Sequence, residues 1–264
     1  MAAVSVNWPA RHDVFGVQVS ATTYDQAEAV IIEAARQRRG AVVTHMPVHG
    51  LITAATDAKY RECVNRFDII APDGQPVRWA LNKFHDAGLD DRCYGPELMI
   101  RLCRRAAEQH IGVYLYGSTP EVIEKLSRRL LELCPGLKIA GSESPPFRPL
   151  SDAERQEVVG RINDSGAGLV FIGLGCPRQD YFAGQTKNEI HAVQLCVGAA
   201  FDFHAGNKKM APAWMQRMSL EWLFRLTHEP GRLWKRYLVT NSIFLMLCAK
   251  RLIAGDRKRQ VVTP

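Results

Sequence analysis

A glycine-rich turn between residues 173 and 180 has the residue types of a phosphate or nucleotide site. It reads Gly173-Leu-Gly-Cys-Pro-Arg-Gln-Asp180 and follows an apolar run, residues 168–172, that is typical of a buried strand. Glycine lets the backbone approach a ligand closely, and a helix that starts after such a turn directs free amide hydrogens at an anion. Arg178 stands where the dinucleotide fingerprint has its third glycine, so a tight turn without a ligand is the alternative.

A single carboxylate, Asp73, follows a second apolar run at residues 67–72. Ligands of open α/β sheets bind at the carboxyl ends of the strands, where a carboxylate can accept a proton from a substrate. Pro72-Asp73-Gly74 is also a common turn sequence, so Asp73 as a mere turn former is the alternative.

Alternating strand and helix patterns must position these residues. Helices are expected at residues 24–38, 47–66, 95–109, 120–133 and 151–163, and strands at residues 41–44, 67–72, 111–116, 137–140, 169–172 and 191–197. Short turns join them. The pattern predicts an α/β domain, Rossmann-like with a mostly parallel sheet, over residues 13–204.

The last segment, residues 205–264, differs in kind. It contains two helical patterns, residues 212–227 and 231–252, and holds 12 Lys or Arg against 3 Asp or Glu, whereas the whole chain has 34 against 27. Its apolar run at residues 239–249 is too short and too polar to span a bilayer. We therefore predict a helical appendage that lies on an anionic membrane surface; the alternative is an apolar face that packs on the core or on another subunit in a homo-oligomer.

Composition limits the class of protein further. With 264 residues and 47% hydrophobic side chains, the chain can bury a full core. Its seven cysteines contain no C-x-x-C pair, which argues for reduced thiols and against a zinc site. The N-terminal residues lack the apolar core of a signal peptide, so a cytoplasmic location is expected.

Several short motifs, taken in order, resemble the WecG/TagA/CpsF family of bacterial glycosyltransferases (glycosyltransferase family 26). They span about residues 13–245. The matching pieces are Thr44, Ala71-Pro-Asp-Gly74, Arg92 with Gly95-Pro-Glu97, Tyr116-Gly-Ser118, Gly173 to Asp180, Gly198-Ala-Ala-Phe-Asp-Phe203, Ala211-Pro-Ala-Trp-Met215, Leu220-Glu-Trp-Leu-Phe-Arg-Leu226 and Glu229-Pro-Gly-Arg232.

The resemblance implies an inverting, metal-independent transferase without a cofactor. It would move a sugar from a UDP-sugar to a polyprenyl-diphosphate-linked sugar at the cytoplasmic face of the membrane. Asp73 would be the general base with Thr44 beside it, while arginines of the tail would reach the diphosphate. The residues expected to hold the substrates are Gly74, Arg92, Gly117, Gly173, Gly175, Pro177, Arg178, Gln179, Asp202, Arg225, Arg232 and Arg236.

This chemistry agrees with the residue types. Displacement at an anomeric carbon needs a base for the acceptor proton and positive charge for the departing UDP. Because the sequence shows no Asp-x-Asp metal motif, arginines and backbone amides are expected to supply that charge. A basic tail would both bind lipid and complete the site, which would couple membrane docking to site closure.

The chain departs from the family pattern at three positions. Met46 stands where members often have Asn, Met210 where they often have Arg, and Asp180 where they often have Glu. Since methionine lacks the donors and acceptor of an amide, the identity of the donor sugar is open. We favour a glucosyl donor, with an N-acetylmannosaminyl or N-acetylmannosaminuronyl donor as the alternative.

Two other classes of protein compete with this interpretation. A nicotinamide- or nucleotide-dependent enzyme on a Rossmann-like sheet is weakened by the missing third glycine and by the lack of an acidic ribose-binding residue. A basic membrane- or nucleic-acid-binding module would leave the glycine turn and Asp73 without a purpose. We expect no nucleic-acid partner.

Overall fold

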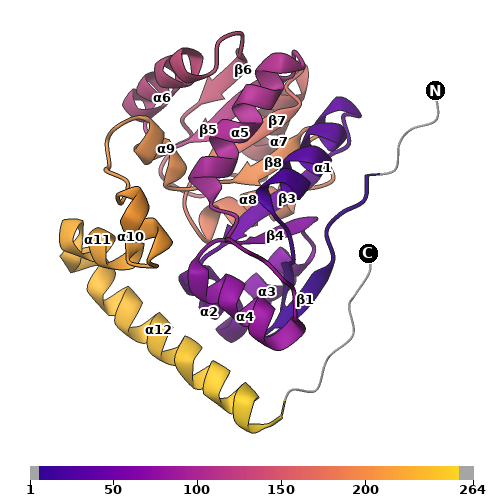
Figure 1. Cartoon of the computed structure of the whole chain (residues 1–264). Helices are drawn as coiled ribbons and strands as arrows, with labels where there is room; N and C mark the ends of the chain where they lie inside the picture. The colour runs from indigo at the N-terminus through magenta and orange to yellow at the C-terminus, as the bar shows by residue number, and fades with distance from the viewer. Residues whose placement is uncertain (1–5, 256–264) are drawn as a thin grey trace.

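The computed structural model describes residues 6–255, apart from the side chains of Ala213, Arg217 and Arg232. Six parallel strands form one sheet in the order β4-β3-β8-β7-β5-β6 (Figure 1). These strands are β3 (Ala41–Met46), β4 (Ile69–Pro72), β5 (Gly112–Gly117), β6 (Lys138–Glu143), β7 (Leu169–Gly173) and β8 (Val193–Cys196). The predicted α/β class with a mostly parallel sheet is confirmed.

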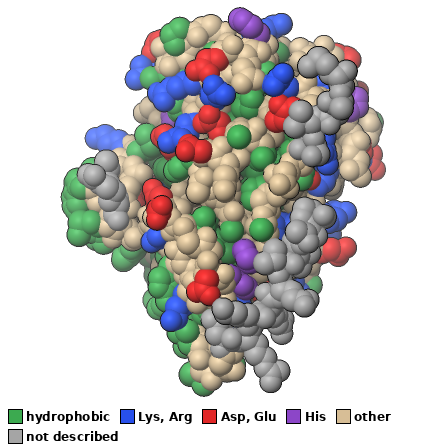
Figure 2. Space-filling view, turned by 45° about the vertical axis from the view of Figure 1, so that its right-hand side comes forward, with side chains coloured by type: hydrophobic (Ala, Val, Ile, Leu, Met, Phe, Trp, Pro, Cys, Tyr) green, Lys and Arg blue, Asp and Glu red, His purple; other side chains and the backbone are tan. Residues whose placement is uncertain are grey.

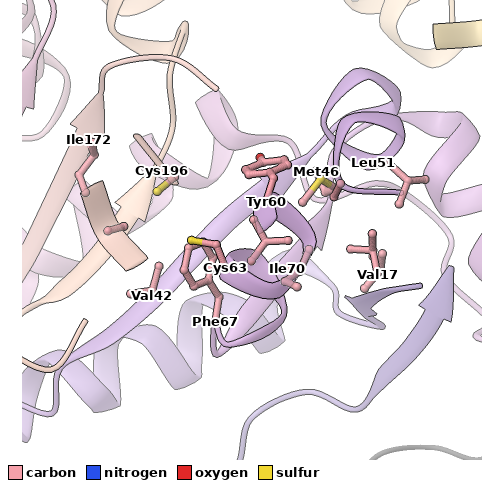
Figure 3. Close-up of a cluster of buried hydrophobic side chains, with 14 of the residues drawn as sticks. Val17, Val42, Met46, Leu51, Tyr60, Cys63, Phe67, Ile70, Ile172 and Cys196 are labelled. Atoms are coloured by element: carbon pink, nitrogen blue, oxygen red, sulfur yellow. The ribbon is translucent and has the colours of Figure 1, made fainter. Parts of the chain in front are cut away.

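Helices cover both faces of the sheet (Figure 1), and its central strands β3, β8 and β7 are almost entirely buried and mainly apolar. One face carries α1 (Tyr24–Arg36), α5 (Gly95–Glu108), α6 (Pro120–Leu133) and α9 (Ala200–His204). The other face carries α2 (Val48–Thr56), α3 (Ala58–Asn65), α4 (Gln75–His85), α7 (Asp152–Asp164) and α8 (Arg178–Thr186). Figure 3 shows part of the second core layer, in which Met46, Tyr60 and Leu51 lie between the sheet and its helices.

The largest differences between the predicted and observed boundaries occur in three elements. The single helix expected over residues 47–66 is divided into α2 and α3, because the Asp57 carboxylate accepts a hydrogen bond from the Tyr60 amide and caps a new helix. The helix expected over residues 212–227 is divided into α10 (Ala213–Arg217) and α11 (Glu221–His228), with Ser219 at a positive φ of 62° between them. The strand expected at residues 137–140 extends to Glu143.

A short antiparallel hairpin precedes the parallel sheet and was not predicted. Its strands, β1 (Arg11–Val14) and β2 (Val17–Ser20), turn through Phe15 and Gly16, which both have positive φ. Polar residues interrupt both strands, so their pattern resembles a loop. The hairpin packs beside β4 and the C-terminal helix, where the Phe15 ring meets Phe244 edge-on at 5.9 Å between centroids.

The C-terminal appendage consists of α10, α11 and the long helix α12 (Pro230–Ile253), which runs along the outside of the molecule (Figure 1). One face of α12 packs against α2 and the hairpin, and its buried residues are Leu233, Thr240, Phe244 and Cys248. The opposite face is exposed. Among the helices of residues 6–255, none combines the length and the apolar character that a membrane-crossing segment needs.

The sheet has a topological switch point between β5 and β7. The chain leaves β5 toward β6 through α6 and leaves β7 toward β8 through α8, so the two connections diverge. Gly117 and Gly173 pair at the carboxyl ends of these strands, and a Cβ on Gly117 would come within 2.7 Å of the Gly173 backbone. Ligands of open α/β sheets bind in the crevice outside such a point.

Candidate active site

Asp73 is the first residue after β4, at the carboxyl end of that strand. Its amide donates to the Met46 carbonyl oxygen at 3.2 Å, which fixes the backbone, and Gly74 continues with a φ of 136° before α4 begins. The pKa of the Asp73 carboxyl is raised to about 7, chiefly by burial; Glu221 also raises it, while Arg92 and Arg225 lower it. A carboxylate that gains its proton near neutral pH has the properties of a general base.

Arg92 connects this carboxylate to the appendage. Its guanidinium donates to Glu221 of α11 at 2.6 Å and to the Gln216 side-chain oxygen of α10 at 3.1 Å, and it lies 4.2 Å from the centre of the Tyr94 ring. The side chains of Arg92 and Glu221 are only 10% and 12% exposed. The core and the appendage therefore share one nearly buried ion pair next to Asp73, which we call the Arg92–Glu221 pair.

A cavity of about 610 Å³ opens beside this pair, where the core meets the appendage. Its walls include Tyr24, Gln75, Asp91, Arg92, Tyr94 and Gln216. The Gln75 amide donates to Asp91 at 2.8 Å, so carboxylate, amide and aromatic groups face one space. Such a mixture of rings and polar groups suits a hydroxyl-rich ligand.

The glycine turn forms a second part of the site, three strands away along the sheet edge. Gly175 has a φ of 78°, and its amide donates to the Gln179 side-chain oxygen at 3.2 Å. Pro177 follows a cis peptide bond and α8 begins at Arg178. Gln179 is buried, so in this structure its side chain supports the turn from inside.

Thr44 lies in a buried network behind the turn rather than next to Asp73. Its hydroxyl donates to one oxygen of Asp180 at 2.5 Å, and the Tyr60 hydroxyl donates to the other at 2.9 Å. Burial raises the pKa of Asp180, while these two donors lower it. The network ties β3 and α3 to the start of α8, which gives Thr44 a role in positioning the glycine turn.

The arginines of the appendage lie near both parts of the site. Arg225 is close enough to lower the pKa of Asp73, and Arg236 is close enough to lower the pKa of Cys176 in the glycine turn, although burial raises both values overall. The Arg232 side chain lies outside the described residues. Asp202 pairs with Lys208 at 3.5 Å and so faces the start of the appendage.

Apart from Thr44, Asp202 and Arg232, the sequence-predicted residues form two groups along one edge of the sheet. Asp73, Gly74, Arg92 and Arg225 gather at β4, whereas Gly117, Gly173, Gly175, Pro177, Arg178, Gln179 and Arg236 gather at β5, β7 and the glycine turn. Sequence reasoning missed Gln216 and Glu221 as partners of Arg92. Glu221 belongs to a matching tail motif, but a pairing across 129 residues leaves no local signal.

Comparisons with known proteins identify the family of this chain. The family model described as "Glycosyl transferase WecG/TagA/CpsF family" matches residues 12–258. A protein of Bacillus spizizenii (strain ATCC 23059 / NRRL B-14472 / W23), N-acetylglucosaminyldiphosphoundecaprenol N-acetyl-beta-D-mannosaminyltransferase, is 32% identical over 204 residues. The match covers 76% of each chain.

Proposed function

Because this chain belongs to the WecG/TagA/CpsF family of glycosyl transferases, we propose that it transfers N-acetylmannosamine from a UDP-sugar to an N-acetylglucosaminyl diphosphate carried on a polyprenyl lipid. The activity of the Bacillus relative supports this donor and this acceptor. It favours the N-acetylmannosaminyl alternative over the glucosyl donor that we preferred from the sequence. The Met46 side chain is 1% exposed and lies in the core (Figure 3), so in this structure it lines no cleft.

The spacing of the two groups of residues suits an extended nucleotide sugar. The sheet order β7-β8-β3-β4 puts three interstrand steps, about 14 Å, between the glycine turn and Asp73. The nucleotide would lie at the switch point and the sugar would reach toward Asp73. Arg92, Arg225 and Arg236 would place positive charge along the path of the diphosphate.

Asp73 would take the proton of the acceptor hydroxyl as that oxygen attacks the anomeric carbon. The bond between this carbon and the oxygen of the diphosphate breaks as the new glycosidic bond forms, and UDP leaves from the opposite face with inversion. The guanidinium groups neutralise the charge that develops on UDP, so the arginines of this chain can supply the electrostatic stabilisation that the reaction needs. The acceptor sugar would occupy the cavity beside Arg92.

The observation that carries this proposal is Asp73, a carboxylate with a pKa of about 7 between arginines of the core and of the appendage. The test offers the purified protein UDP-N-acetylmannosamine, UDP-N-acetylmannosaminuronate or UDP-glucose together with a prenyl-diphosphate-linked N-acetylglucosamine, and identifies the lipid product by mass. We expect the lipid product to gain the mass of one N-acetylhexosamine. A gain of one hexose alone would favour the glucosyl donor instead. If no donor gave a product, the proposed sugar transfer would be refuted.

We also propose that the outer face of the appendage rests on the cytoplasmic leaflet of the membrane. Large apolar side chains gather on this face, and those at least 40% exposed include Trp214, Met218, Trp222, Trp234, Leu238 and Leu245. Figure 2 shows hydrophobic side chains at the left-hand edge, where the appendage lies in Figure 1. Exposed Lys235 and Lys250 accompany them on α12, and each basic residue near an anionic leaflet adds about 1 kcal/mol.

Removing two of these apolar side chains should weaken membrane binding. Trp234 and Leu238 lie one helical turn apart and are 55% and 62% exposed, so the double variant Trp234→Ser/Leu238→Ser should lower vesicle binding by about tenfold or more. Sedimentation with phosphatidylglycerol vesicles measures this. Leu131→Ser removes a side chain that is 48% exposed on α6, away from the appendage, and should leave binding unchanged. Equal binding of the double variant and the wild type would contradict the proposal.

A further inference from the structure

The loop after β6, residues 144–151, bridges the two sides of the switch point. At its start the Ser144 hydroxyl donates to the Ser118 carbonyl oxygen at 2.6 Å, which fastens the loop to the turn after β5. At its end Arg148 donates to both carboxylate oxygens of Glu154 at 2.6 and 2.9 Å. Three prolines, at 145, 146 and 149, restrict the backbone between these points. The loop is therefore held at the rim of the crevice.

Phe147 projects from this loop against the first residue of α8. Its side chain is 95% exposed, and the Arg178 guanidinium lies 4.6 Å from the centre of its ring. One exposed phenylalanine is ordinary on a protein surface. Phe147 differs because it contacts a planar cation at the start of α8, directly after the glycine turn. Its loop is also anchored to the turn after β5, on the other side of the crevice.

Both groups are surfaces on which a nucleobase stacks. Aromatic rings and arginine guanidinium planes are the side chains that hold unpaired bases in nucleic-acid complexes. The stacked pair lies at the end of the site that is farther from Asp73, beyond the glycine turn. A donor with its sugar at Asp73 and its diphosphate along the glycine turn would bring its base to this rim.

We propose that Phe147 and Arg178 form a stacking platform for the nucleobase of the sugar donor. The inference rests on the proposed function and adds the residues that hold the base. Stacking uses the face of a base rather than its edge, so the platform supplies affinity without selecting among bases. The loop brings the ring to the site already ordered, which lowers the entropy that binding must offset.

Calorimetry with the full chain tests the platform, using UDP and inorganic pyrophosphate as separate ligands. Phe147→Ala should weaken UDP binding by roughly tenfold, the loss that a missing stacking partner causes, and should leave pyrophosphate binding unchanged. Phe147→Trp keeps a flat ring and should bind UDP as the wild type does. Because Phe147 is exposed, both variants should keep the thermal midpoint of the wild type.

The possible failures have different meanings. Equal UDP affinity in Phe147→Ala and the wild type would overturn the platform while leaving the proposed function intact. A parallel loss of UDP and pyrophosphate binding would also overturn it, because the ring would then act through the glycine turn. The wild type could also bind UDP no more tightly than pyrophosphate. That result would overturn the proposed UDP-sugar donor, and the platform with it.

Discussion

Replacing Asp73 by asparagine will lower the rate of sugar transfer by a factor of about 10² to 10⁴, the usual contribution of a positioned general base. Asparagine keeps the size of the side chain and one acceptor oxygen, but an NH2 donor replaces the second oxygen and the side chain cannot take a proton from the acceptor hydroxyl. The measurement is the rate of formation of the lipid-linked product at saturating donor. Asp164→Asn changes an exposed carboxylate at the end of α7 and should keep the wild-type rate.

The same substitution should make the protein more stable at alkaline pH. The Asp73 pKa is raised from 3.8 to about 7 in the folded protein, so between these values the folded state binds more protons than the unfolded state. Stability from this group is therefore present at low pH and is lost as the pH rises through 7. Asp73→Asn should unfold at a higher temperature than the wild type at pH 8, and the difference should shrink toward pH 4. A lower midpoint at pH 8 would mean that the carboxylate stabilises the fold.

The main sheet could be predicted because its signal is local. Runs such as residues 169–172 are fully buried in the structure, and continuous apolar character is what a strand covered on both faces requires. The glycines of the site could also be recognised, since their turns need positive φ or close backbone approach. The position of Asp73 could be predicted because the apolar run before it indicates a strand that ends there.

The missed features depend on contacts between distant segments. The hairpin β1–β2 has four-residue strands with polar residues, and it is stable because Val14, Val17 and Val19 join the core beneath α3 and α12. Thr44 meets Asp180 across 136 residues. The break between α10 and α11 places Gln216 and Glu221 together on Arg92, and a continuous helix over residues 212–227 would not have suggested that contact.

The charges around Asp73 lead to a second prediction: two variants should shift the pKa of Asp73 in opposite directions. Arg92 lowers the pKa of Asp73 and Glu221 raises it, although burial is the largest influence. Arg92→Met should therefore raise the pH at which kcat/KM falls on the acid side, and Glu221→Gln should lower it. The measurement is the pH dependence of kcat/KM between pH 5 and pH 9 for both variants and the wild type.

Arg92→Met should have the larger effect on rate and on stability. The loss of the charge-assisted hydrogen bonds that we propose from Arg92 to the donor should reduce kcat/KM by about ten- to a hundredfold at the optimum. It also leaves Glu221 nearly buried without its partner, which should destabilise the fold by about 3–5 kcal/mol in urea unfolding. Arg105→Met is the matched control, because Arg105 pairs with Glu28 and Glu108 away from the cavity, and its substitution should change neither the pH profile nor the rate.

Opposite shifts would mean that the appendage contributes to the pKa of Asp73. Glu221 and Arg225 both belong to α11, and substituting Glu221 tests one part of that contribution while Arg92 stays in place. Both variants could instead move the fall of kcat/KM at acid pH in the same direction, or move it no further than Arg105→Met does. That fall would then report the pKa of a group other than Asp73. The assignment of the general base would then be wrong even if Asp73→Asn were inactive.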